Sequence, residues 1–253
     1  DIADVVVVDN GSTDESLSVL KQEFPDVLTL CFDKNYGYAE GYNRAIRELG
    51  YRYSVLLNSD VAATPEWIRP LYEYMEAHPE VAACQPKILS DADHTKFEYA
   101  GASGGFIDKH GYPFCRGRIF DTVETDNGQY NDITDIFWAT GAALTVRTEE
   151  YLAAGGLDKD FFAHMEEIDL CWRLHQRGLA IRVIPQSVVF HLGGGSLPAS
   201  NPKKTYLNFR NNLFLLYKNL PPREGRRMLL IRRLYDTLAF FVFMAKMDFA
   251  NAR

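Results

Sequence analysis

Ten residues near the start of the chain, VVVVDNGSTD (residues 5–14), decide the fold. Four consecutive valines are typical of a strand that is buried on both faces. The polar run that follows begins with Asp9 and continues with residues that form turns and helix caps. The stretch therefore predicts a strand, a turn and then a helix over residues 16–24, which is the opening of an α/β fold.

The same alternation of strand and helix continues downstream. Strand-like runs are VLTLCF (27–32), YSVLLNSD (53–60) and VAACQPKIL (81–89), and helix-like runs are AEGYNRAIREL (39–49) and PEWIRPLYEYMEAH (65–78). This alternation predicts a parallel sheet with helices on both faces. Because ligands bind beyond the carboxyl ends of the strands in such sheets, Asp9, Asn58 and Asp60 are candidate binding residues.

The pattern changes over residues 97–136, which are rich in glycine and aromatic residues. Hairpins, or a flap laid over the edge of the sheet, are expected there. The next segment, WATGAALTVRTEEYLAAGG (138–156), predicts a strand and then a helix. A later segment, AIRVIPQSVVFHLGGGS (180–196), predicts a pair of strands that ends at His191.

Three carboxylates, Glu166, Glu167 and Asp169, crowd the start of a helical segment, AHMEEIDLCWRLHQRG (163–178). Acids in the first turn of a helix favour the positive end of its dipole, by about 0.3–1 kcal/mol each. Apolar residues at helical spacing follow, and Gly178 ends the segment. From these residues alone, the cluster is either ordinary helix-start chemistry or a set of functional acids.

The composition favours a globular protein. A length of 253 residues with 47% hydrophobic residues suits one α/β domain, or one domain with a small appendage. The four cysteines lie far apart without a C-x-x-C pair, which indicates free thiols in a reducing compartment and argues against a zinc site. The first 200 residues hold 16 basic and 31 acidic residues, and this net charge of -15 argues against a nucleic-acid groove.

The end of the chain has the opposite charge. Residues 201–253 contain 11 basic and 3 acidic residues, for a net charge of +8. Their apolar run TLAFFVFMA (237–245) is too short to span a bilayer, which takes about 20 residues. Two interpretations stay open: a basic, amphipathic segment that lies on an anionic membrane face, or a helix whose apolar side packs on its own domain or on a second subunit.

Five segments, in this order, resemble the motif series of family 2 glycosyltransferases: VVVVDNGSTD, NYGYAEGYNRA, LLNSD, GGLDKDFFAHMEEIDLCWRL and VVFHLGGGS. The likeness is closest to bacterial rhamnosyltransferase-like members that build cell-surface polysaccharide. It implies a GT-A fold, which is a Rossmann-like, mostly parallel sheet with flanking helices, a smaller acceptor-side region and C-terminal helices. The implied domains are a catalytic domain over 1–200, with a nucleotide-binding part over about 1–96 and an acceptor-side part over about 97–200, and a basic helical extension over 201–253.

The resemblance also implies a donor site. Asp9 matches the aspartate that holds the nucleotide base or ribose, and Asn35 falls in a loop that lines the same pocket. Asn58 and Asp60 occupy the two ends of a DXD motif, whose last aspartate binds a divalent metal on the donor diphosphate. His191 matches a histidine that completes this metal site. One carboxylate with one imidazole suits Mn²⁺ better than Mg²⁺, which prefers oxygen ligands.

The resemblance further implies roles for the acidic helix. Glu167 matches the catalytic base, and Glu166 and Asp169 are its neighbours and the alternatives for that role. A carboxylate that takes the proton of the acceptor hydroxyl contributes roughly 10²–10⁴-fold to the rate. Direct in-line attack by that hydroxyl inverts the anomeric configuration. Trp138 is the candidate for stacking on an acceptor sugar, with core packing as the alternative.

The implied activity is inverting, metal-dependent transfer of a hexosyl or rhamnosyl group from a nucleotide-sugar donor to a saccharide or lipid-linked saccharide, in cell-envelope polysaccharide synthesis. A cytoplasmic location, at the inner face of the plasma membrane, is expected. The family's first strand and helix have no counterpart before residue 5, so we expect a fragment of a longer protein. Asn58 replaces an acid of the family, and Glu167 replaces an aspartate. The alternatives are a sugar-nucleotide pyrophosphorylase and a non-catalytic homologue that binds a sugar nucleotide.

Overall fold

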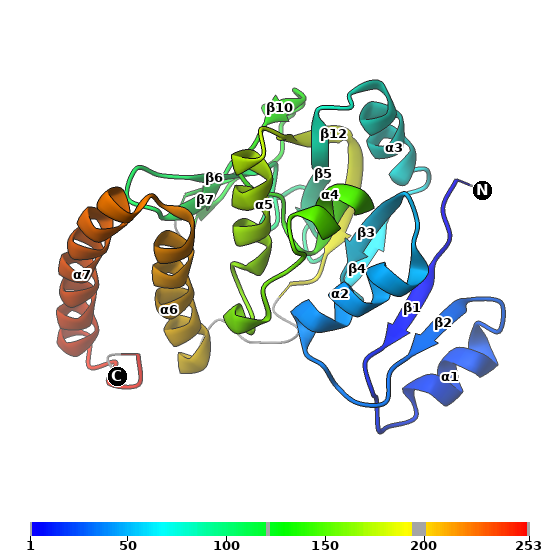
Figure 1. Cartoon of the computed structure of the whole chain (residues 1–253), viewed down its shortest axis with the longest axis horizontal. Coiled ribbons are helices and arrows are strands. Elements are labelled where there is room, and N and C mark those ends of the chain that lie inside the picture. The colour runs from blue at the N-terminus through cyan, green and yellow to red at the C-terminus, as the bar shows by residue number, and fades with distance from the viewer. Residues whose placement is uncertain (1, 120–121, 194–200, 252–253) are drawn as a thin grey trace.

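A computed structural model describes residues 2–119, 122–193 and 201–251 (Figure 1). The helices are α1 (Ser16–Glu23), α2 (Tyr38–Leu49), α3 (Ile68–Ala77), α4 (Thr148–Ala153), the short 3₁₀ helix η1 (Lys159–Phe161), α5 (Glu166–Gln176), α6 (Pro202–Asn219) and α7 (Pro222–Ala245). The larger strands are β1 (Val6–Asp9), β2 (Leu28–Cys31), β3 (Tyr53–Leu57), β5 (Val81–Ser90), β11 (Ala143–Arg147) and β12 (Ala180–His191). Every strand and helix predicted for the first 90 residues is present, with the short β4 (Val61–Ala63) in addition.

The central sheet has the strand order β10–β12–β5–β11–β3, in which β10 is Thr134–Asp135, and β4 pairs with the end of β12. The strands β3, β5 and β12 run in the same direction, as a mostly parallel sheet requires. β11 is the main exception, because it lies antiparallel between β5 and β3. The α/β fold is therefore confirmed, and the carboxyl ends of β3 and β12 lie at one edge of the sheet.

Helices cover both faces of this sheet. Adjacent residues of a strand point to opposite faces, and in β5 this separates Ala83 from Cys84. Cys84 packs with Leu71 and Met75 of α3. Ala83 belongs to the main core, together with residues of α2 and α5. The two buried faces explain why this strand is covered along almost its whole length.

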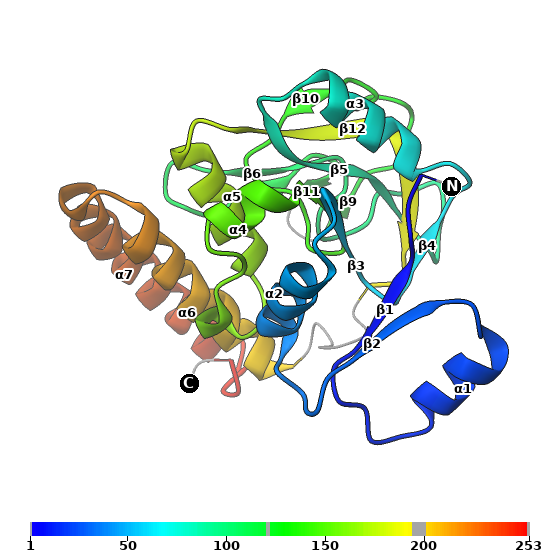
Figure 2. The same cartoon turned by 45° about the vertical axis from the view of Figure 1, so that its right-hand side comes forward.

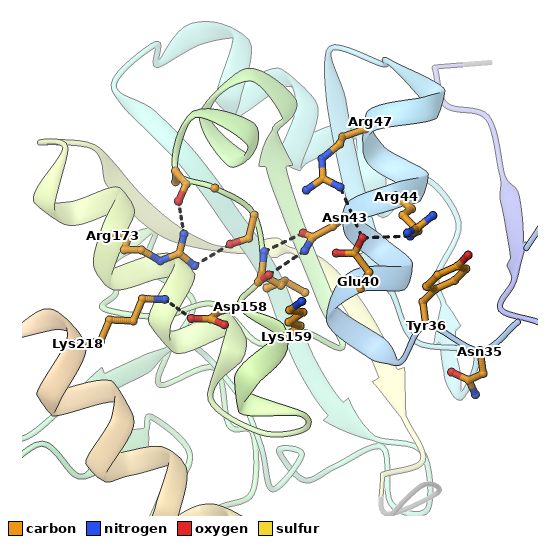
Figure 3. Close-up of a pocket in the computed structure, with 14 residues that line it drawn as sticks. Asn35, Tyr36, Glu40, Asn43, Arg44, Arg47, Asp158, Lys159, Arg173 and Lys218 are labelled. Carbon is orange, nitrogen blue, oxygen red and sulfur yellow. Dashed lines mark hydrogen bonds and ion pairs between the residues drawn. The ribbon is translucent and has the colours of Figure 1, made fainter.

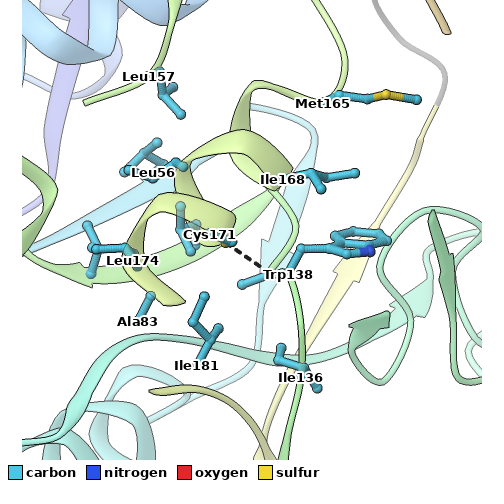
Figure 4. Close-up of a cluster of buried hydrophobic side chains, with 14 of the residues drawn as sticks. Leu56, Ala83, Ile136, Trp138, Leu157, Met165, Ile168, Cys171, Leu174 and Ile181 are labelled. Atoms are coloured by element: carbon cyan, nitrogen blue, oxygen red, sulfur yellow. Dashed lines mark hydrogen bonds between the residues drawn. The ribbon is translucent and has the colours of Figure 1, made fainter. Parts of the chain in front are cut away.

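Trp138 lies in the main core, where it packs close to Ile168 and Cys171 of α5 (Figure 4). Its side chain is 5% exposed, and its indole N–H donates to the carbonyl oxygen of Phe106 at 2.8 Å. The ring lies directly over Gly105, where a Cβ atom would come within 2.1 Å of it. The expectation that Trp138 stacks on an acceptor sugar is therefore wrong, because the ring is buried and its polar atom is already satisfied.

β1, α1 and β2 form a separate unit, a two-stranded parallel sheet with one helix, beside α2 (Figures 1 and 2). Asn10, directly after β1, ties this unit to the start of α2. Its carboxamide donates to the Gly37 carbonyl at 3.0 Å and accepts from the Tyr36 N–H at 2.9 Å. Gly11 has a φ of 77°, and a Cβ atom there would lie 2.4 Å from the Lys34 backbone. The end of β1 is therefore held by a contact that only glycine permits.

The segment after β5 forms the expected hairpins. They make a small antiparallel sheet of β6 (Gly105–Ile107), β7 (Pro113–Cys115), β8 (Arg118–Ile119) and β9 (Thr122–Val123). The prediction of a strand pair over residues 180–191 is wrong, because β12 is one long strand that pairs with β5. Its register shifts between Ile184 and Val188, around Pro185, which has no N–H to donate to a ladder.

α6 and α7 form an antiparallel hairpin at one side of the molecule (Figure 1). α6 packs against α5, and its Leu215 belongs to the main core. α7 packs against the outer side of α6. Among the described helices, none combines the length and the apolar character that crossing a bilayer requires. The predicted boundary near residue 200, like the glycine run after Gly193, lies outside the described residues, and the domain division stays a prediction.

Candidate active site

Asp60 and His191 meet at the edge of the sheet where β3 and β12 end. After β3, a tight turn over residues 58–60 leads into β4, which pairs with the end of β12 so that Val61 lies opposite His191. This register brings the Asp60 Oδ1 atom to 3.2 Å from the His191 Nε2 atom. The Leu192 N–H also donates to the Asp60 carbonyl at 3.1 Å. Two residues that are 131 positions apart are therefore held together by strand pairing.

Glu98 lies on the other side of the His191 ring, and sequence reasoning missed it. Its Oε1 atom lies 3.5 Å from His191 Nδ1, and its side chain is almost fully buried. Its other oxygen accepts from the Ala100 N–H at 2.5 Å. Burial lowers the pKa of His191, but the carboxylates of Glu98 and Asp60 outweigh that effect, so the pKa lies above its usual value. The imidazole thus lies between two acids.

The Asp60–His191 pair fits a divalent cation. Two neighbouring ligand atoms of an octahedral ion with bonds of about 2.1 Å are separated by about 3 Å, which matches the observed 3.2 Å. Histidines that bind metals usually direct their other ring nitrogen to a carboxylate or carbonyl, and here Nδ1 faces Glu98. The described residues contain no group of three His, Cys, Asp or Glu side chains arranged for a metal. The remaining ligands of a cation would therefore come from a substrate and from water.

Glu166 and Glu167 lie at the first turn of α5, directly after a strained loop. Phe162, His164 and Met165 have φ values of 69°, 70° and 74°, a region that side chains other than glycine rarely adopt. Met165 is the residue before the helix, and it gives α5 no side-chain cap. Strain of this kind persists only where the surroundings impose it. The loop therefore fixes the direction in which the side chains of Glu166 and Glu167 point.

α6 supplies the contacts that hold this loop. The amide nitrogen of Asn211, which is fully buried, lies 2.9, 2.7 and 2.7 Å from the carbonyl oxygens of Phe161, Ala163 and His164. The guanidinium of Arg210 donates to the Phe161 carbonyl at 2.7 Å. The sequence around Asn211 carries no local signal of this role, because the partners of Asn211 lie about 50 residues earlier in the chain.

The acids Glu166 and Glu167 have raised pKa values. Burial is the largest cause for Glu166, and the charge of Glu167 adds to it, so that its pKa rises to about 8. Burial also raises the pKa of Glu167 to about 7, although backbone hydrogen bonds at the start of α5 oppose the shift. Glu166 Oε2 is buried without a hydrogen-bond partner among the described residues. Both carboxyl groups therefore gain or lose a proton in the neutral pH range.

This pKa shift predicts how stability changes with pH. The folded pKa of Glu166 is about 8, against about 4.3 in an unfolded chain. Between these values the folded state binds the extra proton, so the free energy of unfolding falls as the pH rises from about 4 to about 8. We expect Glu166→Gln, which carries no charge, to raise the melting temperature more at about pH 8.5 than at about pH 5.

Calorimetry over that pH range checks the prediction. Glu149→Gln, on the exposed face of α4, is the matched control because it removes an acid from the start of another helix. An equal shift of melting temperature for Glu166→Gln at both pH values would contradict the raised pKa.

Glu167 and Asn58 both lie close to the two residues that precede β11, Gly141 and Ala142. A Cβ atom on Gly141 would lie 3.8 Å from the Glu167 Cβ and 2.7 Å from the Tyr38 hydroxyl oxygen. The next carbonyl along the chain, that of Ala142, accepts from the Asn58 N–H at 3.0 Å. The start of α5 and the turn after β3 therefore meet on either side of residues 141–142.

Asp9 ends β1, and Asn35 lies beside that end, in the loop from β2 to α2. The Asp9 carboxylate accepts from the Ser12 N–H at 3.2 Å and is buried. Asn35 Oδ1 accepts from the Gly37 N–H at 2.8 Å, and from the Asn10 carboxamide at 3.2 Å. Both predicted donor residues thus shape turns at this strand end, and sequence reasoning missed Asn10, which organises them.

Asp169 does not join the other acids. It is fully buried between α5 and α6, where its carboxylate accepts from Arg173 at 2.9 Å, Lys218 at 2.8 Å and Asn219 at 2.8 Å. These contacts satisfy both oxygens and neutralise the charge. The expectation that Asp169 is an alternative catalytic acid is therefore wrong, and its role is to join the two helices.

A cleft of about 770 Å³ opens between α2 and the segment from the end of α4 to α5 (Figure 3). Its charged side chains mostly pair with one another, as Arg44 does with Glu40 at 3.1 Å and Lys218 with Asp158 at 2.6 Å. Asn35 lies at its edge. The residues that line it are Asn35, Tyr36, Glu40, Asn43, Arg44, Arg47, Ala154, Gly155, Gly156, Leu157, Asp158, Lys159, Arg173 and Lys218, so the cleft lies apart from the Asp60–His191 pair.

Comparison with known proteins gives a consistent match. The family model described as glycosyl transferase family 2 matches residues 1–136, which is just over half of the chain. An N-acetylglucosaminyl-diphospho-decaprenol L-rhamnosyltransferase of Mycobacterium tuberculosis is 27% identical over 202 residues, which cover 74% of this chain and 66% of that protein. A dTDP-rhamnosyl transferase of Shigella flexneri is 25% identical, over 86% of this chain and 72% of that protein.

The fold is similar to that of solved glycosyltransferases. The crystal structure of GalNAc-T7 with UDP, GalNAc and Mn²⁺ superposes with a TM-score of 0.61 and 14% identity. The superposition covers 85% of this chain and 41% of that one. This likeness supports the GT-A fold, and the chain spans less than half the length of that protein.

Proposed function

This chain belongs to glycosyl transferase family 2, and from that premise we propose that it transfers a hexosyl or rhamnosyl group from a nucleotide-sugar donor to a hydroxyl of a saccharide acceptor. The observation that carries the proposal is the Asp60–His191 pair at the strand ends, on the same edge as Glu167. The rhamnosyltransferase names of both relatives support polysaccharide synthesis as the setting. The family match favours transfer over pyrophosphorylase or non-catalytic binding.

In this proposal, the donor binds at two places along the edge where the strands end. Asp9 and Asn35 contact the nucleoside, because they lie at the end of β1 where a ligand of such a sheet binds. Asp60 and His191 would hold a divalent cation, Mn²⁺ or Mg²⁺, and the Asn58 amide would hydrogen-bond to the diphosphate. The chemistry that such a cation would supply is neutralisation of the negative charge that develops on the departing diphosphate. The Mn²⁺ in the similar structure of GalNAc-T7 supports a metal of this kind.

Proton transfer, in this proposal, falls to Glu167. A pKa of about 7 leaves a large ionised fraction at neutral pH and still gives a strong base. The acceptor hydroxyl gives its proton to the Glu167 carboxylate while its oxygen attacks the anomeric carbon from the side opposite the diphosphate. That direction of attack inverts the anomeric configuration. Glu166, whose pKa is about 8, is largely protonated at neutral pH, which leaves Glu167 as the ionised acid of the pair.

The acceptor is proposed to be a saccharide on a lipid carrier. The relative from Mycobacterium tuberculosis is named for N-acetylglucosaminyl-diphospho-decaprenol, which supports this class of acceptor. An acceptor with a lipid anchor is confined to a membrane, so the enzyme must work at its surface. We therefore propose a location at the cytoplasmic face of the plasma membrane.

A panel of nucleotide sugars tests the proposed function. The chain is incubated with UDP-, GDP- and dTDP-sugars, with and without Mn²⁺, and thermal stabilisation and released products are measured. A donor at 100 times its dissociation constant adds about 2.7 kcal/mol of stability. Metal-dependent release of nucleoside diphosphate supports transfer. Release of pyrophosphate instead, or binding without turnover, would overturn it.

Asn211 is expected to act as a positioning residue. Asn211→Ala removes the contacts to the three loop carbonyls, so the strained loop relaxes and Glu167 shifts. A displacement of about 1 Å costs up to about 10²-fold in rate, and we expect turnover to fall by about 10–10²-fold with little change in donor affinity.

The matched control for this variant is Asn219→Ala. Asn219 is also a buried asparagine of α6, but it bonds Asp169 rather than the loop. We expect it to lower the melting temperature and to leave turnover per folded molecule near wild type. Equal losses of turnover in the two variants would contradict a specific role for Asn211.

A further inference from the structure

The outward face of α7 is apolar toward its carboxyl end. Phe241 is 61% exposed, and Met247, in the turn after the helix, is 76% exposed. At 3.6 residues per turn, residues 230, 234, 237, 241 and 244 share one face of the helix, opposite the buried Gly225 and Arg232. The exposed large apolar side chains of this region are Leu230, Leu234, Leu238, Phe240, Phe241, Val242, Met244, Met247 and Phe249.

The same face is basic toward the amino end of α7. Arg223, Arg226 and Arg227 are exposed on this face and Arg233 is exposed on its flank, and no ion pair joins any of the four to a described residue. They are four of the 11 basic residues in residues 201–253, which carry a net charge of +8, whereas the first 200 residues carry -15. One face of one helix therefore has a basic half and an apolar half, on a molecule that is otherwise acidic.

Contacts on the inner face keep α7 in this orientation. Arg232 is 1% exposed, its guanidinium lies 3.7 Å from the centre of the Tyr112 ring, and it hydrogen-bonds Asn212 of α6. Near the carboxyl end, Phe243 packs against Phe209 of α6 with ring centres 6.4 Å apart. The helix cannot turn its apolar face inward without exposing a buried arginine, so this face stays directed outward.

The apolar end of α7 lies on the same side of the molecule as the candidate catalytic groups. α7 runs antiparallel to α6, so its end is beside the start of α6, which follows β12 and His191 in the chain. Figures 1 and 2 both show the end of α7, the start of α6 and the start of α5 on one side. Asn211 of α6 also holds the loop before Glu166.

We propose that the outward face of α7 docks on the surface of an anionic bilayer, with its arginines at the lipid phosphates and its apolar half in the interface. A basic, amphipathic helix favours that position. A second copy of the chain fits less well: a parallel pairing of this face brings the arginines of both copies together, and an antiparallel pairing covers them with the apolar half, which leaves their charges without partners. The docking itself is independent of the activity. Its purpose, presenting a lipid-linked acceptor to the site, rests on the proposed function.

Vesicle sedimentation with the full chain tests this proposal, without donor or acceptor. Vesicles of phosphatidylcholine alone are compared with vesicles in which phosphatidylglycerol replaces part of that lipid. We expect binding that depends on phosphatidylglycerol and that weakens as salt is raised. Each basic residue near such a surface contributes about 1 kcal/mol, which is about fivefold in binding, so Arg226→Glu with Arg227→Glu should weaken it at least about 30-fold.

A second variant and a control separate the causes. Phe241→Asp with Met244→Asp removes the apolar contribution and should also release the protein from the vesicles. Val19→Asp with Lys21→Glu makes similar changes on the exposed α1 and should bind like the wild type. Circular dichroism confirms that each variant is folded.

Three results would overturn the proposal: no binding to vesicles that contain phosphatidylglycerol, equal binding to both kinds of vesicle, or a dimer in light scattering that Phe241→Asp breaks. Binding that is retained by a chain without transferase activity would leave the docking standing and sink the proposed function alone.

Discussion

Replacing Glu167 by glutamine is expected to lower turnover by about 10²–10⁴-fold, the contribution of a well-placed general base. Glutamine has nearly the same shape and keeps hydrogen bonds to the start of α5, but it cannot take a proton from the acceptor. Donor affinity should stay near wild type, since the change leaves the Asp60–His191 pair untouched. Turnover and the thermal shift with donor, measured on the same preparations, separate the two effects.

The pH profile gives this prediction a second readout. The base must be ionised, and its pKa is about 7, so wild-type turnover should rise with pH through that value and then level off. Glu166→Gln is the control, because it leaves the base in place. Glu166 has the higher pKa, about 8, and stays protonated while Glu167 titrates, so this variant should keep much of the activity and leave the rising limb at the same pH. If Glu166→Gln abolished turnover and Glu167→Gln did not, the roles of the two acids would be reversed.

Replacing Asp60 by asparagine is expected to lower metal-dependent turnover by at least about 10²-fold, since a bound cation stabilises the departing diphosphate by several kcal/mol. The proposed metal site consists of the Asp60 carboxylate and the His191 imidazole. Replacing that carboxylate by an amide removes the formal negative charge nearest the cation. The stabilisation by donor with Mn²⁺ should disappear in the same variant. A titration with Mn²⁺, followed by turnover and by melting temperature, measures both effects.

Asp93→Asn is the matched control for Asp60→Asn. Asp93 is a half-buried turn residue in the segment after β5, and among the described residues its carboxylate bonds only Thr95 and Lys96. The control should respond to Mn²⁺ as the wild type does. Turnover by Asp60→Asn that Mn²⁺ still stimulates to the wild-type level would show that the cation binds elsewhere.

The sequence predicts those parts of the fold that depend on local pattern. The valine run, the polar residues after it and the helical spacing gave β1, α1 and their successors, because propensity and burial act over a few neighbours. The position of β11 was not predictable in this way. Its residues pair with β3 about ninety positions earlier, and nothing in the strand itself specifies an antiparallel place between two parallel neighbours.

The candidate site shows the same limit. Asp60 and His191 were expected together from a resemblance, whereas Glu98 was missed, since its contact with His191 depends on where β12 ends. The sequence contained a local sign that Asp169 is structural, because Arg173 lies four residues later, at the spacing of a helical ion pair. It contained no such sign for Trp138, since a tryptophan in a glycine-rich segment suits a sugar-binding surface and a core equally.

Both C-terminal helices contact the turn between β6 and β7. The Gly111 carbonyl accepts from Asn212 of α6 at 2.6 Å, and the Tyr112 ring lies against Arg232 of α7. These contacts therefore join the small sheet (β6 to β9) and the hairpin of α6 and α7 into one rigid body. In the docking proposed above, the bilayer on which α7 rests would therefore also fix the orientation of this small sheet relative to the membrane.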